Sequence, residues 1–156
     1  MDKHPILAQI IEQLKEELAI LTAAAKEARQ YAADGETRSE DRYDTRATES
    51  SYLADGQGRM AAEVMQSVET YQTLELRDFG PGNQIALTAL VEVEQGGFRD
   101  LYFLGPRAGG LTVQHQGRDV FVVTPQSPIG QKLLGRVEGN TVTIAAGRQG
   151  WIARVE

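Results

Sequence analysis

The most constraining feature of the sequence is an apolar repeat near its start. Apolar residues recur at alternating steps of four and three, and no proline or glycine interrupts them before Gly35. The repeat comprises Leu7, Ile11, Leu14, Leu18, Leu21, Ala25, Ala28 and Ala32. Such spacing is typical of a coiled-coil seam, and Pro5 suits the first turn of a helix. We therefore predict one long helix over residues 5–33, whose alanine-rich second half lets a partner helix approach closely.

A second, less regular helical run follows after a short connection. Its predicted stripe comprises Leu53, Met60, Val64, Met65, Val68, Tyr71 and Leu74, with the polar Gln57 and Ser67 at seam positions. Gly56 and Gly58 each cost up to about 1 kcal/mol in a helix relative to alanine. We predict a helix over residues 44–76 that lies antiparallel to the first, because short connections join antiparallel neighbours.

The sequence changes character at RDFGPGNQ, residues 77–84, where two glycines and a proline end the helical pattern. Beyond it, runs rich in β-branched and aromatic residues alternate with glycine-bearing turns: IALTALVEVE, DLYFLG, LTVQHQ, DVFVVT, NTVTIAA and WIARVE. These runs predict an antiparallel sheet. Ser127 and Pro128 are typical of a helix cap and first turn, and Gly135 of a helix end, so one short helix accompanies the sheet.

The predicted fold class is therefore α+β. It comprises an antiparallel α-helical coiled-coil hairpin over residues 1–77, with its tip at 34–44, and an antiparallel β-sheet domain with one short helix over residues 80–156. A hydrophobic content of 41% allows a core for 156 residues. An isolated two-helix hairpin has a thin core, so its base is expected to dock on the larger domain.

Composition excludes several functional classes. The chain has no cysteine, which rules out disulfides, thiolate chemistry and cysteine-based zinc sites, and favours a reducing compartment. No apolar run approaches the roughly 20 residues of a membrane span, and the start is amphipathic rather than signal-like. The net charge of −6 offers no basic face for nucleic acid. We therefore expect a cytoplasmic protein without a membrane partner.

The predicted tip holds an unusual cluster of carboxylates. DGETRSEDRYDTR, residues 34–46, contains five of them. Like charges repel, so the cluster is either a solvated turn or a site that meets a cation. Asp41 and Asp44 are spaced i, i+3, and Glu40 and Asp44 i, i+4, which places each pair on one face if the segment is helical.

Several motifs together resemble a known family. SPIGQKLLG from Ser127, followed by GNTVTI from Gly139, is the strongest, and GRM at Gly58 and RSE at Arg38 add to it. With the long hairpin and the glycine–proline break, the chain resembles the bacterial Gre transcript-cleavage factors over nearly its whole length. The resemblance implies an FKBP-like fold for residues 80–156.

The resemblance also implies a transcription elongation factor, not an enzyme. In that family the hairpin enters the secondary channel of RNA polymerase, while the globular domain grips the helical rim outside it. Two tip carboxylates spaced three apart help to hold the second Mg²⁺ and a water, and the polymerase cuts the 3′ end of backtracked RNA. Extra carboxylate oxygens favour the weakly held ion of a two-metal site.

The implied partners follow from this mechanism. They are RNA polymerase and, indirectly, the 3′ end of the nascent RNA. The protein would act as a monomeric transcription regulator, classed with DNA-binding proteins, with no cofactor of its own and a Mg²⁺ shared with the polymerase.

The resemblance leaves more than one assignment for the acidic pair. Two alignments, from RSE and from GRM, each place Glu40 on one of the family's two acidic positions, and neither supplies the second. The spacing of Asp41 and Asp44 restores a pair. We therefore assign Asp41 and Asp44 as the catalytic and Mg²⁺-holding residues, with Glu40 as a third candidate and Glu36 as a weaker one.

Other functions remain open at this point. A Gre-like factor without the full acidic pair would occupy the channel, compete with other factors and not stimulate cleavage. A peptidyl-prolyl isomerase or chaperone would need an exposed aromatic pocket, whereas the aromatic residues are expected mainly in the core: Tyr102, Phe103, Phe121 and Trp151. A plain coiled-coil module would bind some other protein.

Three polar residues are predicted to have no chemical role. His4 and His115 lack neighbouring ligands in sequence and do not predict a metal site. Ser127 has no histidine or aspartate company, so a cap is favoured over a nucleophile.

Overall fold

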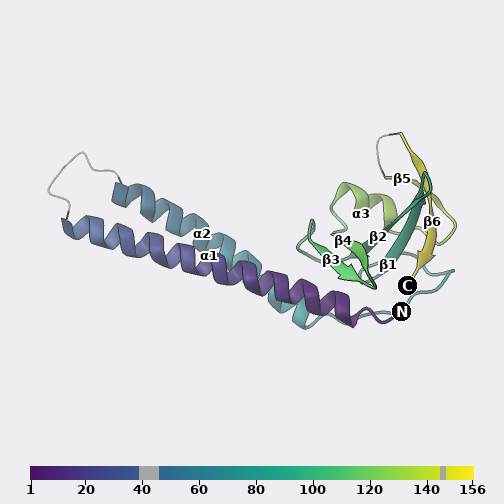
Figure 1. Ribbon diagram of the computed structural model, residues 1–156, viewed down its shortest axis with the longest axis horizontal. Coiled ribbons are helices and arrows are strands. Elements are labelled where there is room, and N and C mark those ends of the chain that lie inside the picture. The colour runs from purple at the N-terminus through teal and green to yellow at the C-terminus, as the bar shows by residue number, and fades with distance from the viewer. Residues whose placement is uncertain (39–45, 145–146) are drawn as a thin grey trace. The chain divides into compact units, whose positions relative to one another are not determined.

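The computed structural model describes residues 1–38, 46–144 and 147–156 (Figure 1). These residues form two compact units, which we call the hairpin unit, Glu12–Glu69, and the sheet unit, Met1–Ile11 with Thr70–Glu156. The sheet unit thus takes in the first turns of one long helix and the end of the other. The predicted division into independent domains at residues 77–80 stays a prediction.

Two long helices account for the first half of the chain. Helix α1 spans His4–Arg38, 35 residues, and α2 spans Arg46–Gln72, 27 residues. At 1.5 Å per residue they are roughly 52 Å and 40 Å long. The first helix continues past residue 33, its predicted end, and through Gly35, because one helical glycine costs only about 1 kcal/mol. The second ends earlier than predicted, where the hydroxyl of Thr73 donates to the carbonyl of Thr70 at 3.3 Å.

The α1 seam within the hairpin unit is confirmed. Leu14, Ala25, Ala28 and Ala32 are at most 7% exposed, and Leu18 and Leu21 are partly buried. The sequence therefore identified the packing face of α1 correctly. Its alanines leave room for a partner helix to come close.

The predicted α2 stripe is wrong at three positions. Leu53, Met60 and Met65 are 56%, 53% and 47% exposed. The predicted Val64, Val68, Tyr71 and Leu74 are buried or partly buried, and so are small or polar residues outside the predicted apolar stripe: Ala54, Gln57, Gly58, Ala61 and Ser67. Small side chains on α2 thus accompany the alanines of α1, and a close seam of this kind excludes bulky side chains. Gly58 lies at this seam, since a Cβ there would be 3.2 Å from the Arg29 Nη2 atom.

The sheet unit contains six strands in the order β3-β4-β2-β1-β6-β5. Their bounds are β1 Leu90–Gln95, β2 Phe98–Leu104, β3 Thr112–His115, β4 Arg118–Val123, β5 Thr141–Thr143 and β6 Gln149–Val155, and the short helix α3 spans Pro128–Leu133. The α+β fold class, with two long helices and a sheet bearing one short helix, is confirmed.

One pairing departs from the predicted antiparallel sheet. Strands β2 and β4 are parallel, with Tyr102 opposite Phe121, whereas all other neighbouring strands are antiparallel. The reason is the connection: β3 lies two places out from β2, and β4 returns to the position between them. Glycine-bearing turns alone do not reveal such an insertion.

The core of the sheet unit lies between one sheet face and α3. It includes Val91, Val93, Leu104 and Ile152 from the strands and Leu133 from the helix. The start of α1 is also fixed in this unit. Gln9 pairs with the edge strand β3, because its amide nitrogen donates to the Gln114 carbonyl at 2.6 Å and its oxygen accepts from the Gln114 N–H at 2.8 Å.

Lys3 holds three chain segments together inside the sheet unit. It is 3% exposed, and its ammonium donates to the carbonyls of Thr88 at 2.8 Å and Glu156 at 3.0 Å, as well as to that of Arg77. Burial lowers the pKa of Lys3, while the charges of Asp78 and Glu156 oppose that shift. Three carbonyl acceptors compensate for the desolvation of this cation.

No helix among the described residues is long and apolar enough to cross a membrane.

Candidate functional site

The predicted acidic residues lie, in sequence, at the end of one long helix and before the start of the other. Glu40, Asp41 and Asp44 lie outside the described residues, and Glu36 belongs to the last turn of α1 with its side chain outside the description. Helix α1 ends at Arg38 and α2 begins at Arg46, so the seven residues between them carry the candidate pair. Their assignment stays a prediction. Within the described ranges, no cluster of His, Asp and Glu has a geometry that would hold a metal.

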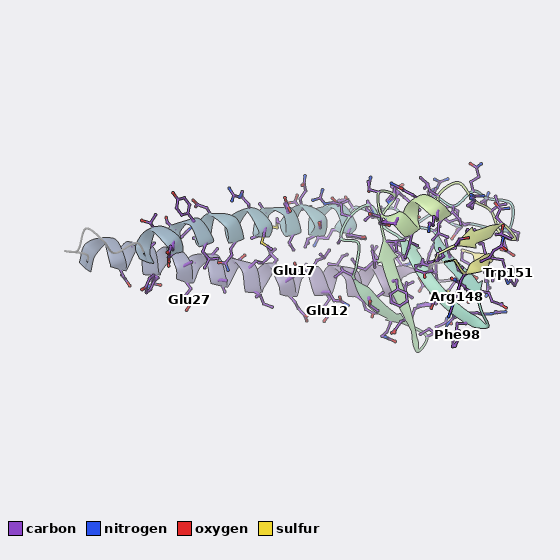
Figure 2. All side chains as sticks on the ribbon, turned by 90° about the horizontal axis from the view of Figure 1, so that it is seen from above. Glu12, Glu17, Glu27, Phe98, Arg148 and Trp151 are labelled. Atoms are coloured by element: carbon purple, nitrogen blue, oxygen red, sulfur yellow. The ribbon has the colours of Figure 1, made fainter. Side chains whose placement is uncertain are left out.

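Charge is divided unevenly between the two units. Residues 12–69 contain 13 acidic and 7 basic residues, a net charge of −6, whereas the sheet unit has 9 of each. The whole net charge of the chain therefore belongs to the hairpin unit. Figure 2 shows the acidic side chains of Glu12, Glu17 and Glu27 along α1. Such a surface disfavours direct contact with nucleic acid phosphates.

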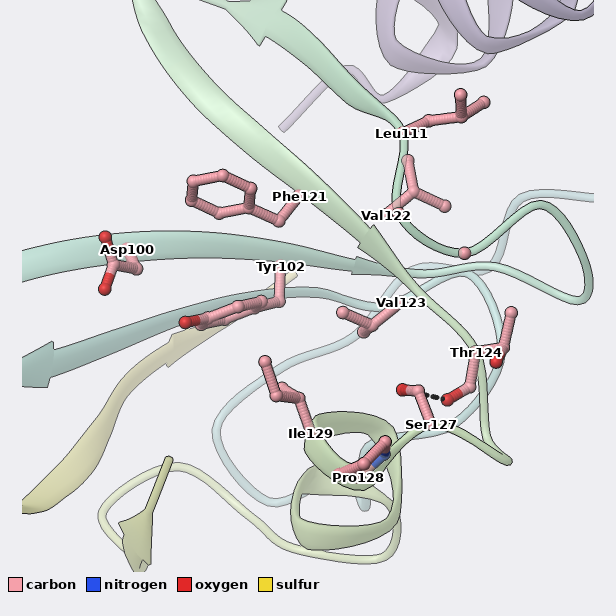
Figure 3. A pocket seen from close by; sticks show the side chains of 12 residues that line it. Asp100, Tyr102, Leu111, Phe121, Val122, Val123, Thr124, Ser127, Pro128 and Ile129 are labelled. Carbon is pink, nitrogen blue, oxygen red and sulfur yellow. Dashed lines mark hydrogen bonds between the residues drawn. The ribbon is translucent and has the colours of Figure 1, made fainter. Parts of the chain in front are cut away.

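An apolar pocket of about 840 Å³ lies in the sheet unit (Figure 3). We call it the aromatic pocket. The rings of Tyr102 on β2 and Phe121 on β4 are 5.9 Å apart between centroids and tilted by 38°. Pro128 and Ile129 line the opposite wall, and Asp100 adds a carboxylate to the lining. A pocket of this size and lining accepts apolar side chains and a basic neighbour.

The SPIG motif builds one wall of the aromatic pocket. Ser127 caps α3: its hydroxyl donates to the Thr124 carbonyl at 2.8 Å and accepts from the Gly130 N–H at 3.0 Å. Pro128 occupies the first helical turn. A Cβ on Gly130 would lie 1.8 Å from the Thr124 carbonyl oxygen, so only glycine fits. The predicted cap is thereby confirmed. Hydrogen bonding and close packing explain why serine and glycine occupy these positions of the motif.

The lining of the aromatic pocket offers little for nucleophilic catalysis. The Ser127 hydroxyl is used as both donor and acceptor, and the lining contains no histidine, lysine or cysteine. Burial, helped by the Asp100 charge, raises the pKa of Tyr102, so its phenol stays protonated at neutral pH. No nucleophile with a general base is present in the lining.

The aromatic residues considered from sequence divide three ways. Tyr102 and Phe121 line the pocket, Phe103 is fully buried, and Trp151 is 43% exposed. The sequence expectation of a core role is therefore correct for Phe103 and for Tyr102, which is 6% exposed and belongs to the hydrophobic core while its ring also lines the pocket. Asp100 and Ile129 were missed, because only the parallel pairing of β2 with β4 opens this side of the sheet beside α3. The one sequence feature that could have indicated a pocket residue is Ile129, which directly follows the Ser127–Pro128 pair.

Four charged side chains form an ion-pair network on β1, β2 and β4. Glu92 lies 3.0 Å from Arg99 and 2.7 Å from Arg118, and Glu94 lies 2.9 Å from Arg99. Burial alone would raise the pKa of Glu92, but hydrogen bonds and charge from Arg118 and Arg99 outweigh it and lower the pKa. Arg118 is thus held within the fold, whereas Arg148 is exposed (Figure 2).

The two histidines occupy unrelated settings. His4 is exposed and pairs with Asp2 at 2.8 Å, and His115 is 6% exposed with its Nε2 atom 2.9 Å from the Met1 sulfur. Neither belongs to a metal-holding cluster among the described residues.

Comparison with known proteins gives structural matches only. No protein-family model matches the chain, and no curated protein matches it. Solved structures of GreA factor homolog 1 (Gfh1) do match. The Thermus thermophilus protein is 19% identical, with 94% of each chain covered and a TM-score of 0.39. The Thermus aquaticus protein is 20% identical, with 95% of this chain and 92% of that chain covered and a TM-score of 0.40. A structure described as the transcription factor Gfh1 is also 20% identical, covering 96% and 92%, with a TM-score of 0.40.

Proposed function

We propose that this chain is an accessory transcription elongation factor of the Gre type, which binds RNA polymerase and acts inside its secondary channel. The observation that carries the proposal is the placement of the acidic segment. The segment joins two helices roughly 52 Å and 40 Å long, in the unit that bears all of the chain's net charge of −6. A long, narrow, negative hairpin suits delivery of oxygen donors into a deep channel.

The hairpin's task is to bring carboxylates to a cation that another protein holds. Carboxylate oxygens are the donors that Mg²⁺ prefers, and Asp41 and Asp44, with Glu40, provide them in the proposed complex. The shared Mg²⁺ supplies Lewis-acid activation of a water in the polymerase site. The chain itself supplies ligands and orientation, so the bond cleavage belongs to the polymerase and the chain is not an enzyme.

The aromatic pocket supplies the proposed grip on the polymerase rim. Its apolar walls fit an apolar side chain from a helix, and Asp100 fits a basic neighbour on that helix. Phe121→Ser should therefore weaken association with core polymerase about tenfold or more, as expected for loss of an aromatic anchor. Phe98→Ser is the matched control, because Phe98 is 73% exposed and outside the pocket lining.

The decisive experiment is RNA cleavage in a stalled, backtracked transcription complex with Mg²⁺. The unmodified chain should stimulate cleavage, and the double variant Asp41→Ala with Asp44→Ala should bind equally well without stimulating. Asp55→Ala with Glu63→Ala removes the same charge from exposed positions on α2 and should cleave normally.

Two other results would each lead to a different conclusion. Binding without stimulated cleavage by the unmodified chain would identify a channel-occupying regulator that competes with other factors. No association with core polymerase would contradict the Gre-type function altogether.

A second candidate function is favoured by the aromatic pocket itself. A peptidyl-prolyl isomerase or chaperone needs an apolar, aromatic cleft, and Tyr102 with Phe121 provides one. The full chain should then accelerate proline isomerisation in a short peptide, and Phe121→Ser should abolish the acceleration. An unchanged isomerisation rate would remove this candidate.

A further inference from the structure

A groove separate from the aromatic pocket lies at the edge strand β5. Strand β5 is the last in the sheet order, and among the strands of the described residues it pairs with β6 alone. Beside it is a groove of about 250 Å³, lined by Lys132, Arg136, Thr141, Val142, Thr143 and Gln149. We call this the β5 groove. All of its lining residues belong to the sheet unit.

The pairing of β5 with β6 determines which backbone N–H and C=O groups of β5 face away from the sheet. Val142 lies opposite Gly150, and one step along the ladder the Ile152 N–H donates to the Asn140 carbonyl at 2.9 Å. In an antiparallel ladder, every second residue directs both backbone groups to the same neighbour. Val142 and the Asn140 carbonyl therefore face β6, while the Asn140 N–H donates to the Val137 carbonyl at 3.1 Å. Thr141 and Thr143 direct their N–H and C=O groups away from β6.

Positive charge borders this edge. Lys132 and Arg136 are exposed, and neither makes an ion pair with any residue that the structure describes. Residues 128–150 carry three cations against one carboxylate, in a chain whose net charge is −6. That carboxylate, Glu138, accepts from the Val155 N–H at 3.3 Å. The β5 groove thus combines outward-facing strand-edge groups with two cations that form no ion pair within the described part of the chain.

We propose that the β5 groove binds an extended acidic segment of a partner protein, which adds to the sheet as a strand beside β5. An added strand satisfies both the donors and the acceptors of Thr141 and Thr143, and acidic side chains at alternate positions meet Lys132 and Arg136. A phosphate ion does not reproduce the alternating donors and acceptors of an added strand. A second copy of β5 would bring like charges together, which disfavours self-pairing.

The chain carries its own reporter for this binding. Trp151 is the only tryptophan and lies opposite Thr141 in the β5–β6 register. The probe is a seven-residue peptide that alternates glutamate and threonine, added to the full chain. Its binding should change Trp151 fluorescence saturably and slow amide exchange at Thr141 and Thr143, but not at Val142, which is already bonded to β6.

Matched variants test the two parts of the proposal. Lys132→Glu with Arg136→Glu should weaken peptide binding about tenfold or more, whereas Lys26→Glu with Arg59→Glu, the same charge change in the hairpin unit, should not. A lysine–threonine peptide and a peptide with proline at an alternate position, which lacks an N–H, should both fail to bind.

Three results would overturn the proposal: exchange at Thr141 and Thr143 unchanged by bound peptide, equal binding of the proline peptide, or full competition by inorganic phosphate. Self-association of the Lys132→Glu, Arg136→Glu variant without any peptide binding by the parent would mean that the two cations only protect a strand edge. The surface does not depend on the polymerase-directed function, and failure in one test leaves the other intact.

Discussion

At a few positions in this chain, the surrounding contacts restrict which side chain the fold can accept. Gly130 is the clearest, because the Thr124 carbonyl oxygen occupies the place of its missing Cβ. Ser127 and Lys3 are similarly constrained, one as a cap with both hydrogen-bonding functions used and the other as a buried cation on three carbonyls. Gly130 and Ser127 shape the wall of the aromatic pocket, and Lys3 fixes the start of α1.

Gly130→Ala should destabilise the sheet unit by about 1–3 kcal/mol, because the added methyl group forces α3 away from Thr124. Chemical denaturation of the full chain measures the change in the free energy of unfolding. Gly82→Ala is the control: a Cβ at Gly82 meets nothing within 4 Å, so its stability should stay within about 0.5 kcal/mol of the parent. Equal stability of the two variants would contradict the packing argument.

The ion pairs of Glu92 predict how stability depends on pH. Its pKa in the folded protein lies below the usual value of 4.5, so the stabilisation is fully present above that usual value. It is lost as the pH falls through the lowered folded value. Glu92→Gln should therefore melt at a lower temperature than the parent at pH 7, and the gap should close towards pH 2. A gap that stays constant over this range would show that the ionised carboxylate is not what stabilises the fold.

At the scale of elements, the stability of the paired helices α1 and α2 is limited by a polar group buried at their seam. The Oε1 atom of Gln57 is buried and has no hydrogen-bond partner among the residues that the structure describes; the adjacent Gly58 faces Arg29. An unsatisfied buried acceptor costs about 1–3 kcal/mol. The middle of the hairpin unit is therefore less stable than its alanine-lined length would suggest.

Gln57→Leu should raise the stability of the hairpin unit by about 1 kcal/mol, since it removes the orphaned acceptor and adds apolar contact. Amide exchange along α2 near residue 57 is the measurement, and slower exchange is expected. Gln72→Leu, at the exposed end of the same helix, should have no such effect. Faster exchange in Gln57→Leu would mean that the glutamine has a partner in solution.

Sequence patterns predicted some elements well and others poorly, for physical reasons. The α1 seam was predictable because its apolar residues follow one unbroken spacing. On α2 the largest apolar residues, Leu53 and Met60, misled the prediction, because a close seam selects small side chains over hydrophobic ones. The parallel β2–β4 pairing, and with it the aromatic pocket, depends on a long-range insertion that local turn residues do not encode. Only the Ser127 cap of the pocket was visible in advance.

At the scale of the whole molecule, charge and binding surfaces are segregated by unit. The hairpin unit carries the net charge of −6 and the candidate carboxylates, whereas the balanced sheet unit carries the aromatic pocket and the β5 groove. We infer a division of labour: the sheet unit supplies affinity and the hairpin unit supplies the chemical effect. Variants of one unit should then alter binding, and variants of the other should alter only the outcome of binding.

The most direct measurement is proximity of the hairpin tip to the RNA 3′ end inside a stalled polymerase complex. The chain has no cysteine, so Ser39→Cys gives a unique attachment point for a short photo-crosslinker, and Gln84→Cys gives an exposed control in the sheet unit. The account predicts that the probe at residue 39 forms an adduct with the RNA 3′ end or with the polymerase active site, and that the probe at residue 84 does not. Adducts only from residue 84, or none from residue 39 in a complex that contains the bound protein, would contradict it.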